Sequence, residues 1–232
     1  MNLLSIALKG GWVMVPIALC SLIAGFIIVE RLLLLRRAQL DLGQFMLKIR
    51  SIFRKGDVSG VLSFCAQKDA PIANILKKGL QKYGDGEERV KEAIENAGKA
   101  EIYHLEKRLG LLATIAGIAP LIGFLGTVAG MIAAFRQIEM LGGNATPSDL
   151  AGGIWEALLT TAFGLVVGIF AYAFYNYFVT RVTRFVHEME SSSTELLELL
   201  HSGGPDAFKS DEAALSEGKS YGTEQAFVRI KR

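Results

Sequence analysis

Residues 109–135 read LGLLATIAGIAPLIGFLGTVAGMIAAF, and residues 157–180 read ALLTTAFGLVVGIFAYAFYNYFVT. These stretches of 27 and 24 residues contain no charged side chain, and neither does a third stretch at residues 10–29. A helix crosses a bilayer with about 20 mostly apolar residues, because its backbone amides must find their partners within the segment. The alternative, three buried helices of a soluble protein, would use up the whole core of a 232-residue chain. The sequence therefore predicts an all-α membrane protein with three transmembrane helices.

The overall composition excludes several other classes of protein. Hydrophobic residues make up 51% of the chain and charged residues 21%, and the mean hydropathy is +0.34, which argues against disorder. The 25 basic and 23 acidic residues nearly cancel, so no basic field indicates a nucleic-acid partner. Two cysteines exclude a disulfide framework, and three histidines leave little for a metal cluster. With no glycine-rich phosphate loop either, we expect no catalytic residue, metal or cofactor, and hence no enzyme.

Basic residues mark one side of the membrane. They follow the first span from Arg31, precede the second up to Arg108, and follow the third from Arg181. Because basic flanks face the cytoplasm, we expect the N-terminus outside and the C-terminus inside. The expected order is an outer N-terminus (1–9), a span (10–35), a cytoplasmic helical domain (36–108), a span (109–136), an outer connection (137–156), a span (157–180), a cytoplasmic helix extension (181–201) and a flexible tail (202–232).

The cytoplasmic part between the first two spans is predicted to be a set of amphipathic helices. Its first helix has apolar residues at helical spacing, namely Phe45, Ile49, Ile52 and Phe53. Gly56 is expected to end that helix, and Asp57 to cap the next. Pro71 is expected to open a third helix, which residues 84–86 end.

Two helices are expected to run on beyond the membrane. From Glu87 the apolar pattern meets no strong breaker, which predicts one long helix into the second span. The third span is predicted to continue to about Leu200, although the polar run at 191–194 weakens the pattern. The tail at 202–232 is expected to be flexible, and it fits a docking peptide equally well.

Small residues recur at helical spacing in the second and third spans. Gly126 with Gly130, and Gly164 with Gly168, form two Gly-x-x-x-Gly pairs, which let helix backbones approach closely in lipid. Pro120 belongs to the same set of residues. We interpret these positions first as helix-packing surface.

Hydroxyl groups lie at mid-depth in the same two spans. Thr127, Thr160 and Thr161 each need a partner there, and each alone can bond back to its own helix. Together they suggest a seam that water can enter. Glu156 lies at the outer mouth, where its carboxylate either attracts cations or ends the helix. Since the two spans contain no Asp, Glu, His, Lys or Arg, we expect that the chain cannot relay protons by itself, and that a partner must bring the titratable group.

Two blocks of sequence resemble those of a known family. They are APLIGFLGTVAGMIAAF at 119–135 and GIWEALLTTAFGLVVGIFAYAFYNY at 153–177, joined by Pro16 and the pair Glu30-Arg31 in the first span. They are similar to the signature blocks of the MotA/TolQ/ExbB proton-channel family, and the resemblance covers about residues 10–200. Three spans, with the large cytoplasmic part after the first, resemble the ExbB/TolQ branch, since the MotA branch has four spans.

This resemblance implies a pentamer in the bacterial inner membrane, with a periplasmic N-terminus and a central pore lined by the second and third spans. The pore would hold the transmembrane helices of an ExbD/TolR-like partner, whose single membrane aspartate takes up the proton. Proton flow would then do mechanical work on a TonB/TolA-like protein, for outer-membrane transport or envelope maintenance. By motif position, the family's pore threonines fall on Thr127 and Thr161, and its outer-mouth glutamate falls on Glu156.

The chain departs from the family pattern in the third span. A proline is usual there, whereas this chain has Gly168, Ile169, Phe170 and Ala171, so any kink must come from Gly168 or be absent. The residues do not separate ExbB-like, TolQ-like and specialised motors of the gliding or flagellar-stator kind. A non-conducting scaffold that anchors partner proteins also stays open, because the missing titratable groups fit both functions. A small-molecule carrier would need midplane polar residues and inverted repeats, which we do not find.

Overall fold

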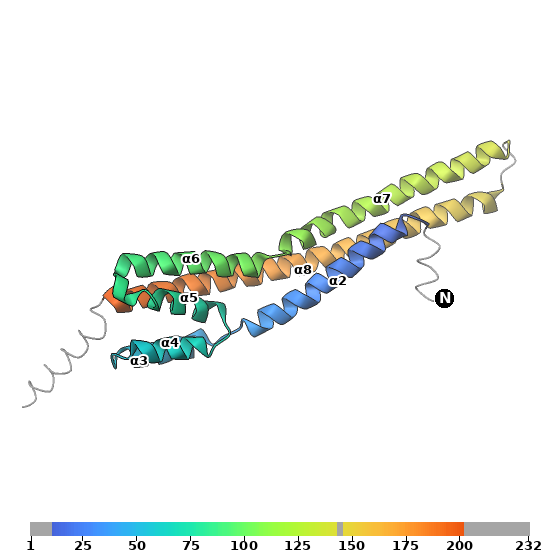
Figure 1. Cartoon of the computed structure of the whole chain (residues 1–232). Coiled ribbons are helices and arrows are strands. Elements are labelled where there is room, and N and C mark those ends of the chain that lie inside the picture. The colour runs from blue at the N-terminus through green and yellow to red at the C-terminus, as the bar shows by residue number, and fades with distance from the viewer. Residues whose placement is uncertain (1–10, 143–145, 202–232) are drawn as a thin grey trace, which may run out of the picture. The chain divides into compact units, whose positions relative to one another are not determined.

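The computed structural model of the chain describes residues 11–142 and 146–201, and the regular elements in these ranges are all helices (Figure 1). They are α2 (Met14–Arg37), α3 (Leu42–Phe53), α4 (Val58–Ala66), α5 (Pro71–Leu80), the 3-10 helix η1 (Tyr83–Asp85), α6 (Glu87–Glu106), α7 (Leu109–Met140) and α8 (Pro147–His201). Three helical stretches are long and apolar enough to cross a membrane, at 14–37, 87–140 and 150–200. The predicted all-α architecture with three membrane-spanning helices is confirmed. The expectations for residues 1–9 and 202–232 lie outside the described residues.

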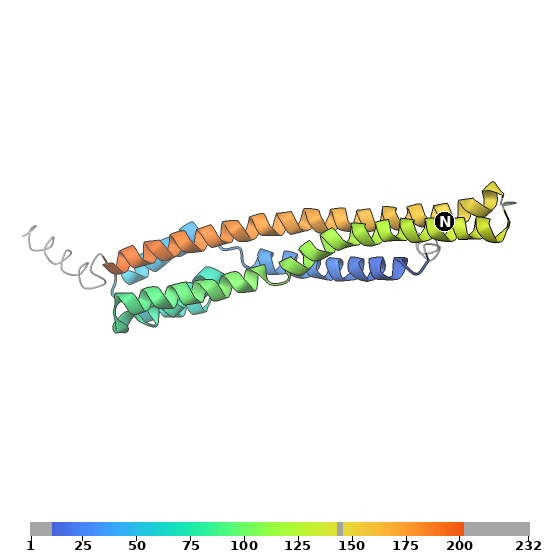
Figure 2. The same ribbon diagram turned by 90° about the horizontal axis from the view of Figure 1, so that it is seen from above.

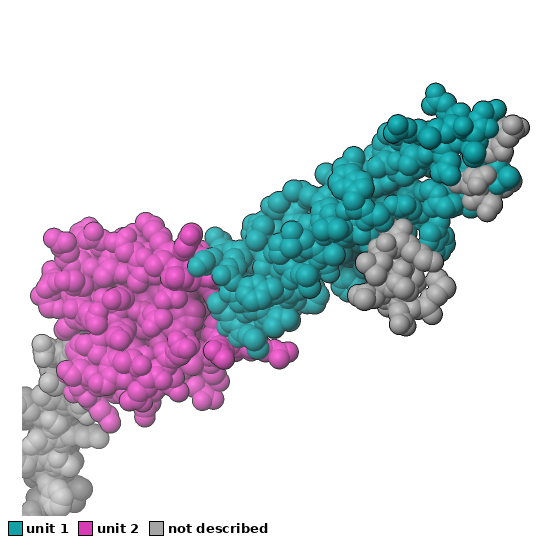
Figure 3. Space-filling view, turned by 45° about the vertical axis from the view of Figure 1, so that its right-hand side comes forward, with its two compact units in different colours: residues 1–34, 106–182 teal, residues 35–105, 183–232 magenta. Residues whose placement is uncertain are grey.

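The chain divides into two compact units, which Figure 3 shows in different colours. Unit 1 comprises residues 1–34 and 106–182, and unit 2 comprises residues 35–105 and 183–232. Unit 1 therefore contains most of α2, all of α7 and the first part of α8. Unit 2 contains α3 to α6 and the last part of α8.

The core of unit 1 forms where the start of α2 meets the other two helices. Val13, Met14 and Ile17 are buried there against one residue of α7 and two of α8, namely Ile122, Phe163 and Val167. The opposite face of α2 exposes large apolar side chains at helical spacing, namely Val15, Leu19, Leu22, Phe26, Val29 and Leu33. Burying apolar area is worth about 25 cal/mol per Å², so an exposed face of this size suits a lipid environment.

The predicted unbroken helix from Glu87 into the second span is wrong, because the helix is interrupted at Lys107 and Arg108. Arg108 has φ +65°, in the left-handed region that costs a residue with a side chain roughly 1–2 kcal/mol. Its guanidinium forms an ion pair with Glu30 of α2 and lies 5.7 Å from the centre of the Phe26 ring. These contacts offset the backbone strain, so α6 ends and α7 begins afresh at Leu109.

The first three helices of unit 2 follow the capping residues that the sequence predicts. The Asp57 side chain accepts a 2.7 Å hydrogen bond from the Gly60 amide at the start of α4, and Pro71 is the first residue of α5. The helices pack through aromatic pairs, such as Phe45 with Phe64 at 5.4 Å between ring centres. The predicted helix starts at Asp57 and Pro71 are confirmed, whereas α3 ends at Phe53, three residues before Gly56, and α5 ends at Leu80, four residues before the expected 84–86.

The last part of α8 belongs to the core of unit 2. The run at 191–194 does not interrupt the helix, because its hydroxyls bond back to the carbonyls of the preceding turn: Ser192 donates to Glu188 at 2.9 Å and Thr194 to Glu190 at 3.0 Å. Glu195 of the same helix pairs with Arg50 of α3. The predicted continuation of the helix to about Leu200 is confirmed.

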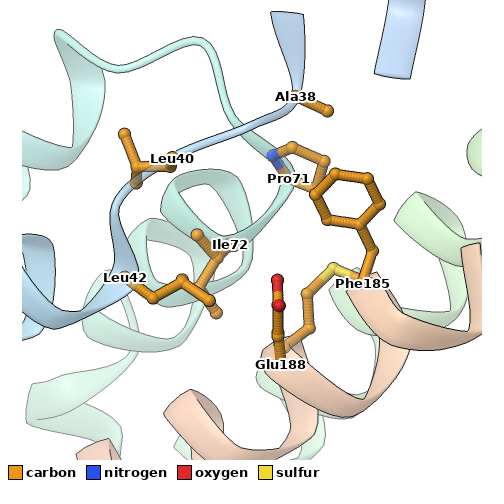
Figure 4. A pocket seen from close by; sticks show the side chains of 8 residues that line it. Ala38, Leu40, Leu42, Pro71, Ile72, Phe185 and Glu188 are labelled. Atoms are coloured by element: carbon orange, nitrogen blue, oxygen red, sulfur yellow. The ribbon is translucent and has the colours of Figure 1, made fainter. Parts of the chain in front are cut away.

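Unit 2 also contains a small cavity between the segment that follows α2, the start of α5 and α8 (Figure 4). The Glu188 carboxylate points into it between Ile72 and Phe185, and Arg184 donates to that carboxylate at 2.8 Å. The cavity has a volume of about 10 Å³, which is at most the space of one water molecule. It is therefore too small for a ligand.

Cys65 of α4 is predicted to resist thiol reagents. It is 1% exposed, and burial raises the pKa of its thiol to about 11, against a smaller lowering by the positive charge of Lys77. Because the thiolate is the reactive form, its fraction at pH 8 is roughly 100-fold below that of an ordinary cysteine. In a Cys20→Ala background, maleimide labelling of the folded protein should be slow, should speed up as the pH rises, and should become fast in denaturant. Rapid labelling before unfolding would contradict the burial of α4.

Candidate functional site

Helices α7 and α8 lie side by side in unit 1 (Figures 1 and 2) and touch through small residues. The facing pairs are Ala134 with Gly153, Gly130 with Ala157, Gly126 with Thr160, Gly123 with Gly164, and Pro120 with Gly168. A Cβ placed on Gly164 would lie 2.6 Å from the Ala119 carbonyl oxygen and 2.9 Å from the Cα of Gly123. We call this contact the α7–α8 seam. It brings backbone against backbone, which is how small residues associate helices in lipid.

All four glycines of the predicted Gly-x-x-x-Gly pairs lie in the seam, and so does Pro120. Proline has no amide hydrogen, so the Ala116 carbonyl loses its normal partner one turn later. A Cβ on Gly168 would lie 2.4 Å from the Pro120 ring and 3.1 Å from this carbonyl oxygen. Gly168 thus gives room to the proline of the neighbouring helix. Helix α8 continues through this position without interruption.

The three predicted threonines lie at neighbouring levels of the seam, but in different surroundings. Thr160 is 1% exposed and donates to the Ala157 carbonyl of its own helix at 2.8 Å. Thr127 is half-buried and donates to Phe124 at 2.5 Å, also within its helix. Thr161 is half-buried and donates across the seam to the Gly123 carbonyl at 2.9 Å. Gly123 lies one helical turn before Thr127.

These hydrogen bonds decide what the hydroxyls can still bind. A hydroxyl has one hydrogen to donate and two lone pairs to accept with. The hydrogens of all three threonines are committed to backbone carbonyls, so each oxygen is left as an acceptor. Since Thr160 is buried between the helices, only Thr127 and Thr161 keep an oxygen within reach of a group outside the pair.

Glu156 lies at the end of unit 1 where α2 begins. A Cβ on Gly11 would lie 1.8 Å from Glu156 Oε1, so the carboxylate rests against the backbone just before α2. Gly11 has φ +66°, a conformation that glycine adopts without strain. The carboxylate of α8 therefore lies beside the positive end of the α2 dipole.

This position predicts a small, salt-dependent stabilisation by the charge of Glu156. Glu156→Gln should lower the free energy of unfolding in detergent by about 0.3–1 kcal/mol at low ionic strength, and by less in high salt. Glu139→Gln removes an exposed carboxylate from the end of α7 and is the matched control. Equal effects of the two changes would show that the charge of Glu156 does not act on α2.

At the opposite end of the spans, charged residues of α2 and α7 meet. Arg108 pairs with Glu30, while Arg31, 2% exposed, lies 3.8 Å from the other oxygen of Glu30. Sequence reasoning did not predict that Arg108 would join this cluster. The available signal was that Glu30 closes one apolar stretch and Arg108 precedes the next, which places opposite charges at the same end of two neighbouring spans.

Between these two charged ends, the spans contain no acidic, basic or histidine side chain that could relay a proton. Residues 109–135 and 157–180 contain no Asp, Glu, His, Lys or Arg. Among residues 11–142 and 146–201, no three His, Cys, Asp or Glu side chains are grouped as metal ligands would be. The arrangement provides an apolar helix pair with two acceptor hydroxyls at mid-depth.

Comparison with known proteins places this site in a family. Residues 67–191 match the model of the MotA/TolQ/ExbB proton channel family. This range contains the seam, Glu156 and all three threonines.

Several related proteins are similar in sequence to this chain. The ExbB-like 3 biopolymer transport protein of Synechocystis sp. is 32% identical over 173 residues, which cover 74% of this chain and 82% of that protein. The ExbB-like 1 protein of the same organism is 30% identical, over 86% of this chain and 79% of its own length. The Tol-Pal system protein TolQ of Haemophilus influenzae is 38% identical over 109 residues, or 47% of each chain.

A solved structure shares the fold. The C. jejuni MotAB structure has a TM-score of 0.63 and 17% sequence identity to this chain, and the match covers 91% of this chain and 82% of that one. At this identity the likeness concerns the fold alone.

Proposed function

Because the chain belongs to the MotA/TolQ/ExbB proton channel family, we propose that it is the pore-forming subunit of an ExbB/TolQ-like motor driven by the proton motive force. In this proposal, five copies surround a central pore in the bacterial inner membrane. The pore houses the transmembrane helices of an ExbD/TolR-like protein with a single membrane aspartate. The assembly couples proton flow to mechanical work on a TonB/TolA-like protein.

One observation carries the proposal: within residues 109–135 and 157–180, the two helices of the seam contain acceptor hydroxyls but no Asp, Glu, His, Lys or Arg. A protonated carboxylic acid has an O–H to donate, whereas a carboxylate only accepts. Thr127 and Thr161, whose hydrogens are already committed to backbone carbonyls, therefore favour the protonated form of a partner aspartate. A neutral acid is also the form that an apolar span tolerates.

We accordingly assign different roles to the threonines. Thr127 and Thr161 face the partner aspartate and hold water beside it, while Thr160 fills the space over Gly126 and supports the proton pathway by packing. Glu156 lies at the outer mouth, where its charge both stabilises the start of α2 and attracts protons. The half-buried positions of Thr127 and Thr161 and the buried position of Thr160 support these assignments.

The orientation in the membrane follows from the basic residues. Most of those that flank the spans gather at the end that contains Arg31, Arg108 and Arg181, whereas the opposite end contains Arg136 together with Glu139 and Glu156. Since basic flanks face the cytoplasm, we place unit 2 and the C-terminus in the cytoplasm, and the N-terminus in the periplasm. Helices α6 and α8 then extend from the second and third spans into the cytoplasm.

Reconstitution tests this function directly. The chain is placed in lipid vesicles with a pH-sensitive dye, alone and with the ExbD/TolR-like protein of the same genome. We expect proton flux only with the partner, and no flux when the partner's membrane aspartate is replaced by asparagine. A complex that assembles with fivefold symmetry but never conducts would support the scaffold instead. Flux through the chain alone would contradict the need for a partner carboxylate.

A further inference from the structure

Unit 2 has a groove for which the described residues contain no occupant. It has a volume of about 390 Å³ and lies between α6 and α8, with one residue of α5. Its apolar lining consists of Ile75, Ile94, Ile102, Val186, Met189 and Leu197. A groove of this size and character is large enough to take several side chains of a peptide.

The position of Gly98 in α6 is consistent with an occupant whose backbone packs closely against α6 in this groove. It lines the groove, and a Cβ built on it would meet nothing within 4 Å. Glycine inside a helix is destabilising compared with alanine, and no contact of the described residues requires it here. By contrast, Gly79 of α5 is needed, since its Cβ would lie 2.5 Å from Ile94. A glycine over open space leaves room for another backbone to pack against it.

The chain itself supplies a segment at the right place. Helix α8 ends at His201, four residues after Leu197 at the end of the groove, and 31 residues follow. Their sequence begins SGGPDAFKSDEAALSEG at 202–218. Two glycines and a proline are typical of a reversing loop, and loops of 2–5 residues join antiparallel helices. Asp206 and Gly218 are residue types that start and end a helix.

We propose that residues 206–217 bind in this groove of the same chain as a short helix, antiparallel to α8. The lengths agree. Twelve helical residues span about 18 Å, and the groove runs from Val186 to Leu197 along α8, or about 16 Å.

The side chains of the segment suit the groove. Ala207 and Ala214 are seven residues apart and share one helical face, which allows the close approach that Gly98 permits. Phe208 and Leu215, also seven apart, lie on the same side and supply the apolar contacts. Asp211, four residues after Ala207 and four before Leu215, lies between these pairs on the same face, where its carboxylate would pair with Lys91 or Lys99 at the border of the groove. Glu95 and Glu190 offset the other positive charge there, so apolar packing together with one ion pair carries the binding. The inference concerns unit 2 alone and does not depend on proton conduction.

Disulfide trapping in the full-length, membrane-assembled protein tests the proposal. In a Cys20→Ala background, Lys99→Cys is combined with Ala214→Cys, since Lys99 borders the groove and Ala214 lies on the packed face at the same level. Cys65 stays unchanged because it is buried. Ala100→Cys with Ala214→Cys is the matched control, because Ala100 lies at the same level on the opposite face of α6. We expect mild oxidation to link the first pair within one chain, with at least a fivefold higher yield than the control pair.

Two further changes keep the test decisive. Gly98→Leu fills the groove, and Leu215→Asp alters only the segment; each should lower the yield of the Lys99→Cys, Ala214→Cys disulfide at least fivefold. Equal yields for the test and control pairs would overturn the proposal. A disulfide found only between chains would assign the groove to a neighbouring copy and would also overturn it. The proposal would also be overturned if Gly98→Leu dissociated the oligomer while the double-cysteine protein without this change formed no intrachain disulfide.

Discussion

Gly164→Leu is expected to prevent α7 and α8 from pairing, and so to remove folded protein from the membrane. The Cβ alone would lie 2.6 Å from the Ala119 carbonyl oxygen and 2.9 Å from the Cα of Gly123. These are backbone atoms, which cannot rotate away as a side chain would. Ordinary overpacking costs about 1–3 kcal/mol, and a whole leucine against backbone should cost more than about 4 kcal/mol. That is a large share of a total stability of about 5–15 kcal/mol.

The measurement is the yield of monodisperse protein after solubilisation in detergent, followed by its unfolding in SDS. Gly25→Leu is the matched control, because a Cβ there meets nothing within 4 Å and the residue lies beside exposed Leu22 and Phe26 on α2. The control should behave like the unmodified protein. A Gly164→Leu protein with the elution and stability of the control would refute the backbone-to-backbone contact.

Thr161→Val should lower proton flux through the complex with its partner by roughly 10- to 100-fold. Valine keeps the shape of threonine but removes the acceptor oxygen. A hydrogen bond to a charged or ionising group contributes about 1.5–3 kcal/mol, and each 1.4 kcal/mol is about a factor of ten. Flux is measured with a pH-sensitive dye in vesicles that contain equal amounts of assembled complex.

Two companion variants separate conduction from packing in this experiment. Thr160→Val removes a hydroxyl that is buried and bonded within its own helix, and should leave flux within about twofold. Thr161→Ser restores the oxygen and the bond to Gly123, and should recover most of the flux. If Thr161→Val and Thr160→Val behaved alike, the acceptor role of Thr161 would be mistaken.

Much of the fold follows from local sequence. The three apolar stretches are each long enough to cross a bilayer, so their composition and length alone identify them as candidate spans. Asp57 and Pro71 act within a few residues of themselves, so their helix starts are predictable. The break at Arg108 is different, because nothing in an arginine marks a left-handed conformation. It depends on Glu30 and Phe26, which are about eighty residues earlier in the chain.

In the candidate site, too, some features follow from local sequence and others depend on residues that are distant in the chain. Small residues and hydroxyls at helical spacing indicate which helix faces carry them. They do not indicate that Thr161 bonds to the opposite helix whereas Thr160, one residue earlier, bonds to its own. That difference depends on the register of two antiparallel helices. The contact of Glu156 with Gly11 was likewise unpredictable, since it joins segments about 145 residues apart.

The register of the seam also limits which parts can move during a working cycle. If α8 slipped by one turn, either Thr160 would arrive where Gly164 meets backbone, or Tyr172 would arrive where Gly168 meets the Pro120 ring. Neither side chain fits a contact already too close for a single methyl group. The two helices are therefore expected to move together as one rigid unit. In the proposed motor, any rotation or stroke would then occur at the outer surfaces of this helix pair, against lipid, a neighbouring copy or the enclosed partner, and those surfaces would act as the bearing.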